Sequence, residues 1–209
     1  MIDKQSFLNE LRELGISDPE TLYSALENYQ RILKEKNELI NLISRQTSEE
    51  DFWYKHFLDS LLVLKCLDLS GKKVLDFGSG GGLPGIPIKL ATPGCSMTLL
   101  DSVHKKAAAM TEMVSELGLK DCTVACARVE DYAIDVHFPI FDYILCRAVK
   151  MEPRFEEPLF SLLAAGGKLI CYKAQSFEDI EGYRPQTLLI HDAEWGSRKI
   201  MSIRKKDLK

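Results

Sequence analysis

Apolar residues recur at helical spacing through the first 70 residues of the chain. In the clearest stretch the positions are Leu22, Leu26, Tyr29, Leu33 and Ile40, with charged residues between them. Ser17-Asp18-Pro19-Glu20 precedes this stretch as a capping box, with proline in the first helical turn. A second start signal is Thr47-Ser48-Glu49-Glu50, and Phe52, Phe57, Leu61 and Leu64 follow it on an apolar side. The pattern predicts a helical N-terminal extension over residues 1–70.

From Gly71 onward the pattern changes to short apolar runs that alternate with amphipathic stretches. The runs predict strands over residues 73–77, 97–101, 123–127, 141–146 and 168–172, and a closing antiparallel pair over residues 187–190 and 199–203. Ser102 is expected to cap the helix after the second strand, and Gly118 to end it. Strand alternating with helix indicates an α/β domain over residues 71–209, with helices on both faces of a mostly parallel sheet. Ligands of such sheets bind beyond the carboxyl ends of the strands.

A glycine-rich turn follows the first predicted strand. The turn contains Gly78, Gly80 and Gly82, and an acid, Asp101, ends the next strand 19 residues beyond Gly82. Glycines permit backbone angles closed to other residues and let a ligand approach the main chain. An acid at this separation is suited to bind the two hydroxyls of a ribose. The turn therefore predicts a site for a ribose-bearing ligand.

The residues around the turn favour S-adenosylmethionine as that ligand. No Gly-Lys-Ser/Thr sequence follows the glycines, as a phosphate-binding loop of the Walker type requires. Asp76, two residues before Gly78, would repel a pyrophosphate and attract a cation. S-adenosylmethionine carries a sulfonium and an ammonium and no phosphate. A nucleotide and a purely structural turn are the alternatives.

Composition and charge set limits on the partners. The chain has 209 residues, 45% of them apolar and 28% charged, with a formal net charge of −4. An acidic total argues against a protein that coats nucleic acid by charge alone, but a local basic patch can still bind it. Residues 1–70 carry −5, residues 71–195 carry −4 and residues 196–209 carry +5. This basic C-terminal block, together with Lys105 and Lys106, is a candidate contact for RNA phosphates; an ordinary solvated strand end is the alternative.

Several protein classes are not expected from this sequence. No apolar run approaches the roughly 20 residues that cross a bilayer, and the first residues do not resemble a secretory signal. The six cysteines form no Cys-x-x-Cys pair. We therefore expect buried, reduced thiols in a cytoplasmic protein without a metal; a zinc site or a disulfide framework is the weaker alternative. The cysteines are Cys66, Cys95, Cys122, Cys126, Cys146 and Cys171.

The stretch from Asp76 to Pro87, DFGSGGGLPGIP, resembles the signature of the glucose-inhibited division protein B family. These are the bacterial small-subunit ribosomal RNA guanine-N7 methyltransferases. Agreement extends over roughly residues 35–205, in the order given by Asn41-Leu42-Ile43, His56-Phe57-Leu58-Asp59-Ser60, Leu99-Leu100-Asp101-Ser102, Arg128-Val129-Glu130 and Arg147-Ala148. Two positions depart from the family pattern: Cys146 stands where serine is usual, and Ala174 follows Lys173 where glycine is usual.

The resemblance implies a fold, a cofactor and a partner. The fold is that of a class I S-adenosylmethionine-dependent methyltransferase, Rossmann-like, with a seven-stranded sheet. Its cofactor pocket would include Gly78 and Leu83 at the turn, Val129 and Glu130 at the adenine end, and Arg147 after the fourth strand. Glu130 would accept from the adenine amino group, or it is a solvated acid. The substrate would be small-subunit ribosomal RNA or an assembling small subunit. The cofactor would be converted to S-adenosylhomocysteine. The protein would be a monomer.

Arg147 and Lys173 are the residues expected to position the substrate. Guanine N7 already carries an in-plane lone pair, so its methylation requires no general base and rests on placement and exclusion of water. Arg147 could hold guanine O6 or a phosphate; an ion pair with a nearby acid is the alternative. We expect Arg147→Ala to lose methylation and remain folded. Lys173 could contact the RNA backbone or be solvated.

The segment from Phe52 to Asp59 leaves two questions open. His56 and Asp59 are neighbours on one helix face, where they could close over the substrate or tie the N-terminal helices to the core. The aromatic side chains nearby could stack on bases, but their helical spacing favours core packing. These side chains are Phe52, Trp53, Tyr54 and Phe57.

Three functions fit these observations. The leading one is methylation of ribosomal RNA at guanine N7. A class I methyltransferase acting on a small molecule is the second, and a non-catalytic module that binds S-adenosylmethionine is the third. Gly78, Gly80, Gly82 and Asp101 are compatible with all three.

Overall fold

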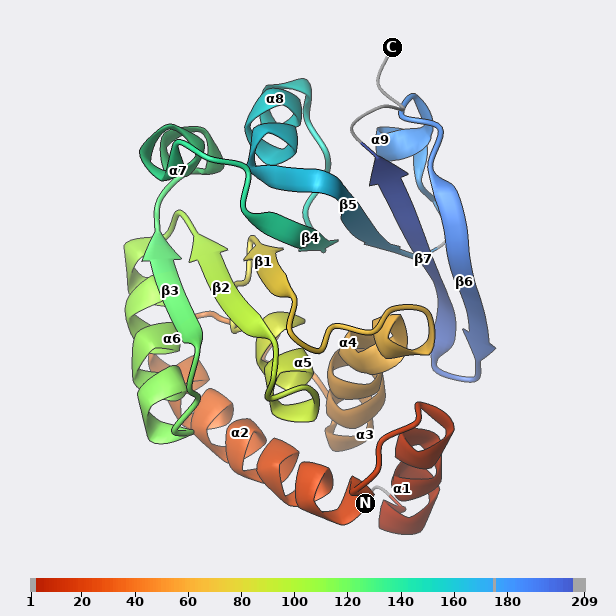
Figure 1. Ribbon diagram of the computed structural model, residues 1–209. Helices are drawn as coiled ribbons and strands as arrows, with labels where there is room; N and C mark the ends of the chain where they lie inside the picture. The colour runs from red at the N-terminus through yellow and green to blue at the C-terminus, as the bar shows by residue number, and fades with distance from the viewer. Residues whose placement is uncertain (1–2, 175, 205–209) are drawn as a thin grey trace.

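A seven-stranded sheet forms the centre of the structure, a computed structural model that describes residues 3–174 and 176–204 (Figure 1). The strands lie in the order β3-β2-β1-β4-β5-β7-β6. The strands from β3 to β5 are parallel, β7 runs antiparallel to β5, and β6 runs antiparallel to β7. The strand order reverses between β1 and β4, and ligands of open α/β sheets bind outside the carboxyl ends of the strands at such a point. The predicted α/β fold is confirmed.

Each strand expected from the sequence is present. The strands are β1 (Lys73–Phe77), β2 (Ser96–Asp101), β3 (Cys122–Cys126), β4 (Phe141–Arg147), β5 (Leu163–Lys173), β6 (Gln186–Ala193) and β7 (Gly196–Arg204). The largest difference is at β5, which begins five residues before the expected Lys168. Its register against β4 shifts there, from Phe141 opposite Leu163 to Tyr143 opposite Lys168. Two glycines in this irregular stretch concealed the strand from periodicity alone.

The helices cover both faces of the sheet. They are α1 (Lys4–Glu13), α2 (Pro19–Leu39), α3 (Glu49–Asp51), the π-helix η1 (Phe52–Leu58), α4 (Asp59–Leu61), the 3-10 helix η2 (Leu62–Lys65), α5 (Gly85–Ala91), α6 (His104–Glu116), α7 (Val129–Val136), α8 (Pro153–Leu162) and α9 (Glu178–Glu181). Helices α2, α4, α5 and α6 lie on one face, and α7 and α8 on the other (Figure 1). The single run from α3 to η2 changes helix type three times, which residue spacing did not predict.

Two helix starts differ from the expected ones. The N-cap of α2 is Asp18 and not Ser17, because the Asp18 carboxylate accepts from the Thr21 amide at 3.1 Å. Ser102 does not cap α6, whose N-cap is Val103. The carboxylate of Asp101 accepts a hydrogen bond from the Val103 amide at 2.9 Å, but no side chain caps the first turn of α6 itself. The position of the residue at the N-cap therefore decides the capping of α2, whereas α6 begins without a side-chain cap.

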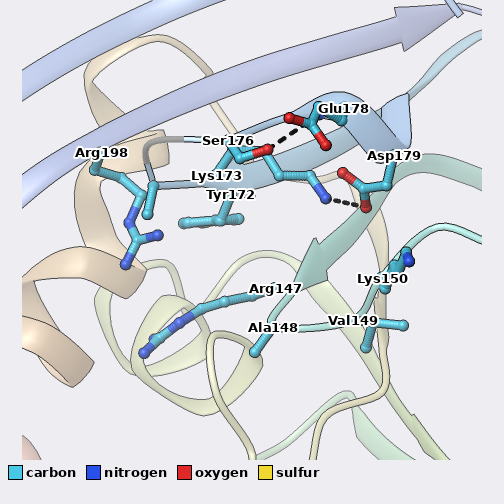
Figure 2. A pocket seen from close by; sticks show the side chains of 11 residues that line it. Arg147, Ala148, Val149, Lys150, Tyr172, Lys173, Ser176, Glu178, Asp179 and Arg198 are labelled. Atoms are coloured by element: carbon cyan, nitrogen blue, oxygen red, sulfur yellow. Dashed lines mark hydrogen bonds and ion pairs between the residues drawn. The ribbon is translucent and has the colours of Figure 1, made fainter. Parts of the chain in front are cut away.

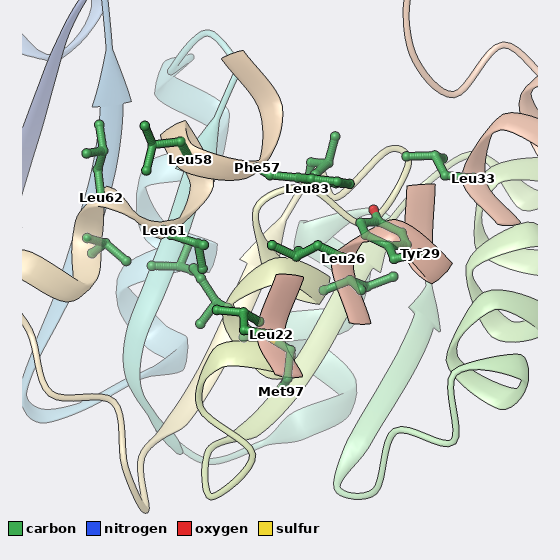
Figure 3. Close-up of a cluster of buried hydrophobic side chains, with 14 of the residues drawn as sticks. Leu22, Leu26, Tyr29, Leu33, Phe57, Leu58, Leu61, Leu62, Leu83 and Met97 are labelled. Carbon is green, nitrogen blue, oxygen red and sulfur yellow. The ribbon is translucent and has the colours of Figure 1, made fainter. Parts of the chain in front are cut away.

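The N-terminal helices share one continuous core with the sheet (Figure 3). Side chains of α2 and of the α3–η2 run interdigitate with Leu83 and Met97. Tyr29 packs against Phe57 with ring centroids 5.5 Å apart, and Trp53 stacks on Tyr23 at 4.5 Å. The expectation of core packing is confirmed for three of the four aromatic residues, since Phe52, Trp53 and Phe57 are at most 1% exposed, while Tyr54 is half-buried.

Two further expectations concern cysteines and membranes. All six cysteines are free thiols; Cys95, Cys146 and Cys171 are buried, but Cys126 is exposed, so burial was wrongly expected there. Cys126 is the last residue of edge strand β3, which has a neighbouring strand, β2, on one side only. Within the described residues, no helix combines the length and the apolar character that crossing a membrane requires. Of the basic C-terminal block, residues 205–209 lie outside the described part of the chain.

Candidate active site

Two neighbouring cavities open at the carboxyl edge of the parallel strands. The first, here called the turn cavity, has a volume of about 300 Å³ and lies over the ends of β1 and β2. The second, here called the rim cavity, has a volume of about 660 Å³ and lies over the ends of β4, β5 and the start of β7. Val149 lines both. The two cavities therefore adjoin at the loop that follows β4.

The glycine turn requires glycine at two positions for different reasons. Gly78 has φ +76°, and a Cβ there would lie 2.5 Å from Cγ2 of Val149. Gly85 begins α5, and a Cβ there would lie 2.3 Å from Leu99 and 2.8 Å from the Asp76 carboxylate. The first glycine keeps the turn cavity open, and the second lets α5 approach the sheet closely.

Asp76 lies beneath the turn and does not line either cavity. Its side chain is fully buried, and Oδ2 accepts from the Gly85 amide at 2.9 Å. Burial raises the pKa of this carboxyl to about 7, and the hydrogen bond from Gly85 opposes the rise. The sequence suggested that Asp76 attracts a cationic ligand directly. Its geometry instead assigns it to holding the start of α5 against β1.

Asp101 reaches the turn cavity with its carboxylate fixed by two backbone amides. Oδ2 accepts from Gly80 and Oδ1 accepts from Val103, both at 2.9 Å. The residue is 8% exposed and lines the cavity. Each oxygen keeps a second lone pair for a ligand hydroxyl. Gly80 thus contributes by orienting Asp101.

The structure brings together four of the residues predicted for the cofactor. Gly78, Asp101, Val129 and Glu130 line the turn cavity. The other five cofactor candidates, Asp76, Gly80, Gly82, Leu83 and Arg147, are not part of its wall. Gly82 and Leu83 donate their amides to the Ser79 carbonyl at 2.8 and 3.0 Å, so they shape the turn from behind.

The turn cavity fits S-adenosylmethionine by its chemistry. Phe77, Leu100, Val129 and Phe155 give it apolar walls, and Asp101 and Glu130 stand at its polar ends. Such a wall suits an adenine ring, with carboxylates available to ribose hydroxyls and to an amino group. The volume is at the small end of the range for ligand sites. Two arginines, Arg128 and Arg154, also line the cavity. Arg154 lies 2.8 Å from Glu152 and 3.8 Å from Glu130, so its charge is shared between acids.

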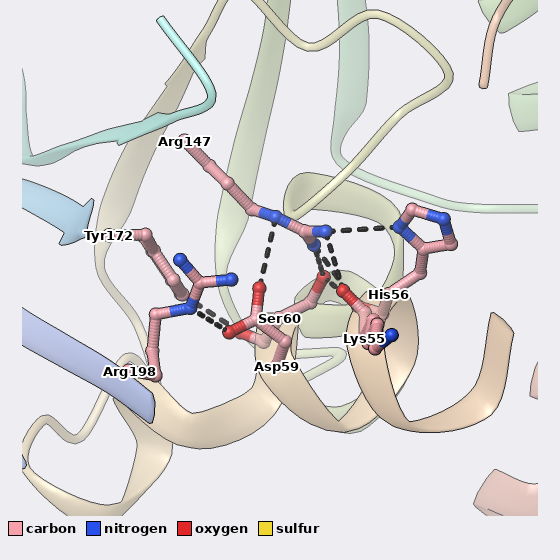
Figure 4. Close-up of polar contacts among 7 residues, drawn as sticks. All are labelled: Lys55, His56, Asp59, Ser60, Arg147, Tyr172 and Arg198. Carbon is pink, nitrogen blue, oxygen red and sulfur yellow. Dashed lines mark hydrogen bonds and ion pairs between the residues drawn. The ribbon is translucent and has the colours of Figure 1, made fainter. Parts of the chain in front are cut away.

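All four N–H donors on the two Nη groups of Arg147 have a partner, and its Nε is ion-paired (Figure 4). Nη1 donates to the His56 carbonyl at 3.1 Å and to Ser60 Oγ at 2.7 Å; Nη2 donates to the Lys55 carbonyl at 2.8 Å and meets His56 Nδ1 at 3.1 Å. Nε lies 3.1 Å from Oδ2 of Asp59. A guanidinium carries five N–H donors and no acceptor. Arg147 therefore ties the end of β4 to the π-helix η1, and its two Nη groups have no donor left in this arrangement.

Asp59 is the acid between two arginines. Its carboxylate is fully buried and pairs with Arg147 through Oδ2 and with Nε of Arg198 through Oδ1. Of the two readings left open for His56 and Asp59, this geometry favours the tie between the N-terminal helices and the sheet. Tyr172 strengthens the tie, because its hydroxyl donates to the Ser60 carbonyl at 2.9 Å. Burial raises the pKa of Tyr172 well above its usual value, so it stays neutral.

Arg147 also fixes the protonation state of His56. A guanidinium can only donate, so Nδ1 of His56 must accept and the ring proton resides on Nε2. Burial, together with the charge of Arg147, lowers the pKa of His56 to about 4. His56 is therefore neutral at physiological pH.

Lys173 lines the rim cavity but is not solvated (Figure 2). It is 8% exposed, and Nζ lies 2.5 Å from Oδ2 of Asp179, which also accepts from the Met151 amide at 2.8 Å. Burial opposes ionisation of Asp179, but these two hydrogen bonds outweigh it and lower its pKa. Ala174 lines the same cavity. Of the two readings left open for Lys173, solvation is ruled out; Lys173 is one half of an ion pair that joins β5 to α9.

Sequence reasoning missed two residues of the site. Val149 separates the cavities and follows Ala148, a non-glycine residue with φ +58°, which no spacing rule would reveal. Arg198 lines the rim cavity, although the sequence placed it only within a basic tail. A turn that brings the start of β7 beside the end of β5 accounts for its position, with Lys199 opposite Lys173.

The fold and the paired cavities define the class I S-adenosylmethionine-dependent methyltransferase architecture. The solved structure of an S-adenosylmethionine-dependent methyltransferase from Aquifex aeolicus matches 82% of this chain and 98% of its own, with a TM-score of 0.58 at 17% identity. This likeness shows the fold.

The chain belongs to the rRNA small subunit methyltransferase G family, whose model matches residues 22–199. It is 34% identical to ribosomal RNA small subunit methyltransferase G of Lachnoclostridium phytofermentans, over 83% of this chain and 72% of that protein. It is 36% identical to the protein of the same name from Carboxydothermus hydrogenoformans, over 80% and 71%. The family resemblance seen in the motifs is confirmed.

Replacing Gly78 should close the turn cavity. In Gly78→Ala the new methyl group would meet Val149, and the left-handed backbone would cost about 1–2 kcal/mol of stability. Gly118→Ala is the matched control, because Gly118 has φ +62° and nothing within 4 Å of its Cβ position. Both variants should lose similar stability, whereas calorimetry should show at least tenfold weaker S-adenosylmethionine binding by Gly78→Ala alone. Equal affinities in the two variants would contradict this account of the cavity.

Removing Arg147 should destabilise the protein, contrary to the expectation from sequence. Arg147→Ala leaves buried acceptors on η1 without donors and Asp59 with one partner, at a cost of about 3 kcal/mol in the free energy of unfolding. The control is Arg31→Ala, which breaks an exposed pair with Glu35 at a cost of about 0.5 kcal/mol. Urea unfolding measures both. Similar losses in the two variants would rule out the structural role of Arg147.

The low pKa of His56 predicts a loss of stability in acid. Its folded value, about 4, lies below the usual 6.5, so the unfolded chain takes up the proton first as the pH falls. Stability from this residue is complete above pH 6.5 and decreases toward pH 4, by roughly 3 kcal/mol. His56→Gln does not titrate, so wild type should lose that much more than the variant between pH 7 and pH 4 in urea unfolding. Parallel pH profiles would show that His56 does not titrate as described.

Proposed function

We propose that the protein transfers a methyl group from S-adenosylmethionine to N7 of a guanine in small-subunit (16S) ribosomal RNA. The main support for the proposal is that the turn cavity and the rim cavity lie next to each other and share Val149 as a lining residue. One cavity has the walls of an adenosine site, and the other opens beside it at the rim of the sheet. Membership of the rRNA small subunit methyltransferase G family supports the choice of RNA as the substrate.

Roles for the site residues follow from where they lie. Gly78, Val129 and Glu130 would hold the adenosine part of the cofactor, and Asp101 would accept from the ribose hydroxyls. Asp76, Gly80, Gly82 and Leu83 support these contacts by shaping the turn. Arg147 and Lys173 act as positioning residues, because each is held by its own partners on the rim.

The reaction requires the protein mainly to place guanine N7 in line with the methyl carbon. When bound, S-adenosylmethionine supplies a methyl carbon on a sulfonium, and the bond to guanine N7 forms as the carbon–sulfur bond breaks and its electron pair returns to sulfur, giving S-adenosylhomocysteine. The residues of the two cavities have to bring the base and the methyl group into line and exclude water. Val149, between the cavities, is the side chain placed to set that approach. A site without a free general base is sufficient for this reaction.

The rim cavity favours a large substrate over a small one. It is the larger cavity, about 660 Å³, and cationic side chains from β4, β7 and the loop after β4 border it. A polyanion that lies across the rim would meet these charges, whereas a small neutral metabolite would leave them unused. We propose a cytoplasmic monomer that acts on ribosomal RNA or on an assembling small subunit.

The test is a map of N7-methylguanosine in small-subunit ribosomal RNA from a strain that lacks the gene. Reverse-transcription or cleavage mapping should show one N7-methylguanosine missing, restored by the wild-type gene and by Gly118→Ala, but not by Gly78→Ala. The purified protein should transfer labelled methyl to subunits from the deletion strain.

Other outcomes would select the alternative functions. An unchanged methylation map in the deletion strain would reject the RNA substrate. Labelled methyl transferred only to a small-molecule extract would favour a metabolite methyltransferase. Tight cofactor binding with no transfer to either would favour a binding module.

A further inference from the structure

Arg198 differs from Arg147 in how many of its donors are in use. Arg198 is 19% exposed at its side chain, and its Nε pairs with Oδ1 of Asp59. Within residues 3–174 and 176–204, no hydrogen bond is made by its two Nη groups. The residue lines the rim cavity, and Figures 2 and 4 show its guanidinium beside that of Arg147. It can therefore offer a fork of two nitrogens to a ligand.

The charges around Asp59 do not balance. One fully buried carboxylate pairs with two guanidiniums, whose side chains are 11% and 19% exposed. Arg147 is surrounded by neutral acceptors of η1, so the excess positive charge faces the rim cavity through Arg198. A largely buried charge without a counterion is costly, and an anion that enters the cavity would relieve the cost. Lys173 does not contribute to this excess, because Asp179 neutralises it.

The position of Arg198 points to the substrate and not to the cofactor. Arg198 comes from β7, which pairs with β5 and lies on the far side of β4 from the glycine turn. It lines the rim cavity and is absent from the wall of the turn cavity. A group that it binds is therefore part of whatever occupies the rim.

We propose that Arg198 binds a phosphate of the RNA substrate through its two Nη groups, while Asp59 holds its Nε. The proposal rests on the function proposed above. Two non-bridging oxygens of a phosphate can accept from both arms of the planar guanidinium fork, and the phosphate supplies the missing negative charge. Guanine O6 would satisfy the donors but not the charge.

Salt dependence of RNA binding tests this inference without requiring methyl transfer. The probes are small ribosomal subunits from the deletion strain and a fragment of their RNA, with S-adenosylhomocysteine present. The variants are Arg198→Gln, which can still donate to Asp59, and Arg198→Lys, which keeps the charge but not the fork. The matched control is Arg31→Gln: Arg31 is an exposed arginine of α2 that pairs with Glu35 and lines neither cavity.

For Arg198→Gln we expect at least tenfold weaker RNA binding at low salt. The slope of log affinity against log salt should become shallower by about 0.7–1, the contribution of one phosphate contact. Arg198→Lys should keep the wild-type slope and still bind several-fold more weakly. S-adenosylhomocysteine affinity, measured by calorimetry, should be unchanged in both variants, and Arg31→Gln should match wild type throughout.

Several results would overturn the inference. An unchanged slope in Arg198→Gln would show that its partner is uncharged, as guanine O6 is. Weaker S-adenosylhomocysteine binding would place Arg198 on the cofactor. If Arg198→Gln does not fold, Arg198→Lys gives the test: a shallower slope of log affinity against log salt in that variant would also reject the phosphate contact. If the wild-type protein binds RNA as expected but transfers no methyl group to it, the proposed reaction is rejected and the phosphate contact still stands.

Discussion

The buried carboxylate of Asp59 is the point on which the arrangement of the active site depends. It joins three segments that are far apart in sequence: the π-helix run near His56, the end of β4 at Arg147 and the start of β7 at Arg198. A carboxylate removed from water is costly unless it is paired, so each segment is held in place by the need to satisfy this one charge. The walls of the rim cavity are set as a result.

The N-terminal helices are therefore part of the site and not an addition to it. Tyr29 of α2 donates its hydroxyl to the Gly81 carbonyl at 2.6 Å, deep in the core. Burial raises the pKa of Tyr29 well above its usual value, which keeps the donor protonated. The Lys55 and His56 carbonyls of η1 accept hydrogen bonds from Arg147. One helix thus fixes the glycine turn and another fixes the end of β4, so both cavities rely on residues that precede the sheet.

The sheet, its glycine turn and Asp101 could be predicted from the sequence because local patterns determine them. Alternation, helical spacing and glycines at a strand end each act within a few residues, and they located β1 to β4 closely. The roles of Asp76, Lys173 and Arg147 could not be predicted from the sequence. Each depends on a partner that the fold brings near, and these partners are Gly85, Asp179 and Asp59 respectively. Spacing identifies where a side chain leaves the backbone, but it does not identify what neutralises its charge.

The two arginines at Asp59 show how donor counting separates similar residues. Family motifs direct attention to Arg147, which ends β4, yet every N–H donor on its two Nη groups already has a partner and its Nε is ion-paired with Asp59. Arg198 lies in a segment without a motif, and among residues 3–174 and 176–204 only its Nε finds a partner. A guanidinium cannot accept a hydrogen bond, and it does not lose its proton at ordinary pH. One whose Nη donors are all in use can therefore hold a structure but cannot offer a fork to a ligand. The arrangement assigns architecture to the first arginine and recognition to the second, with one aspartate serving both.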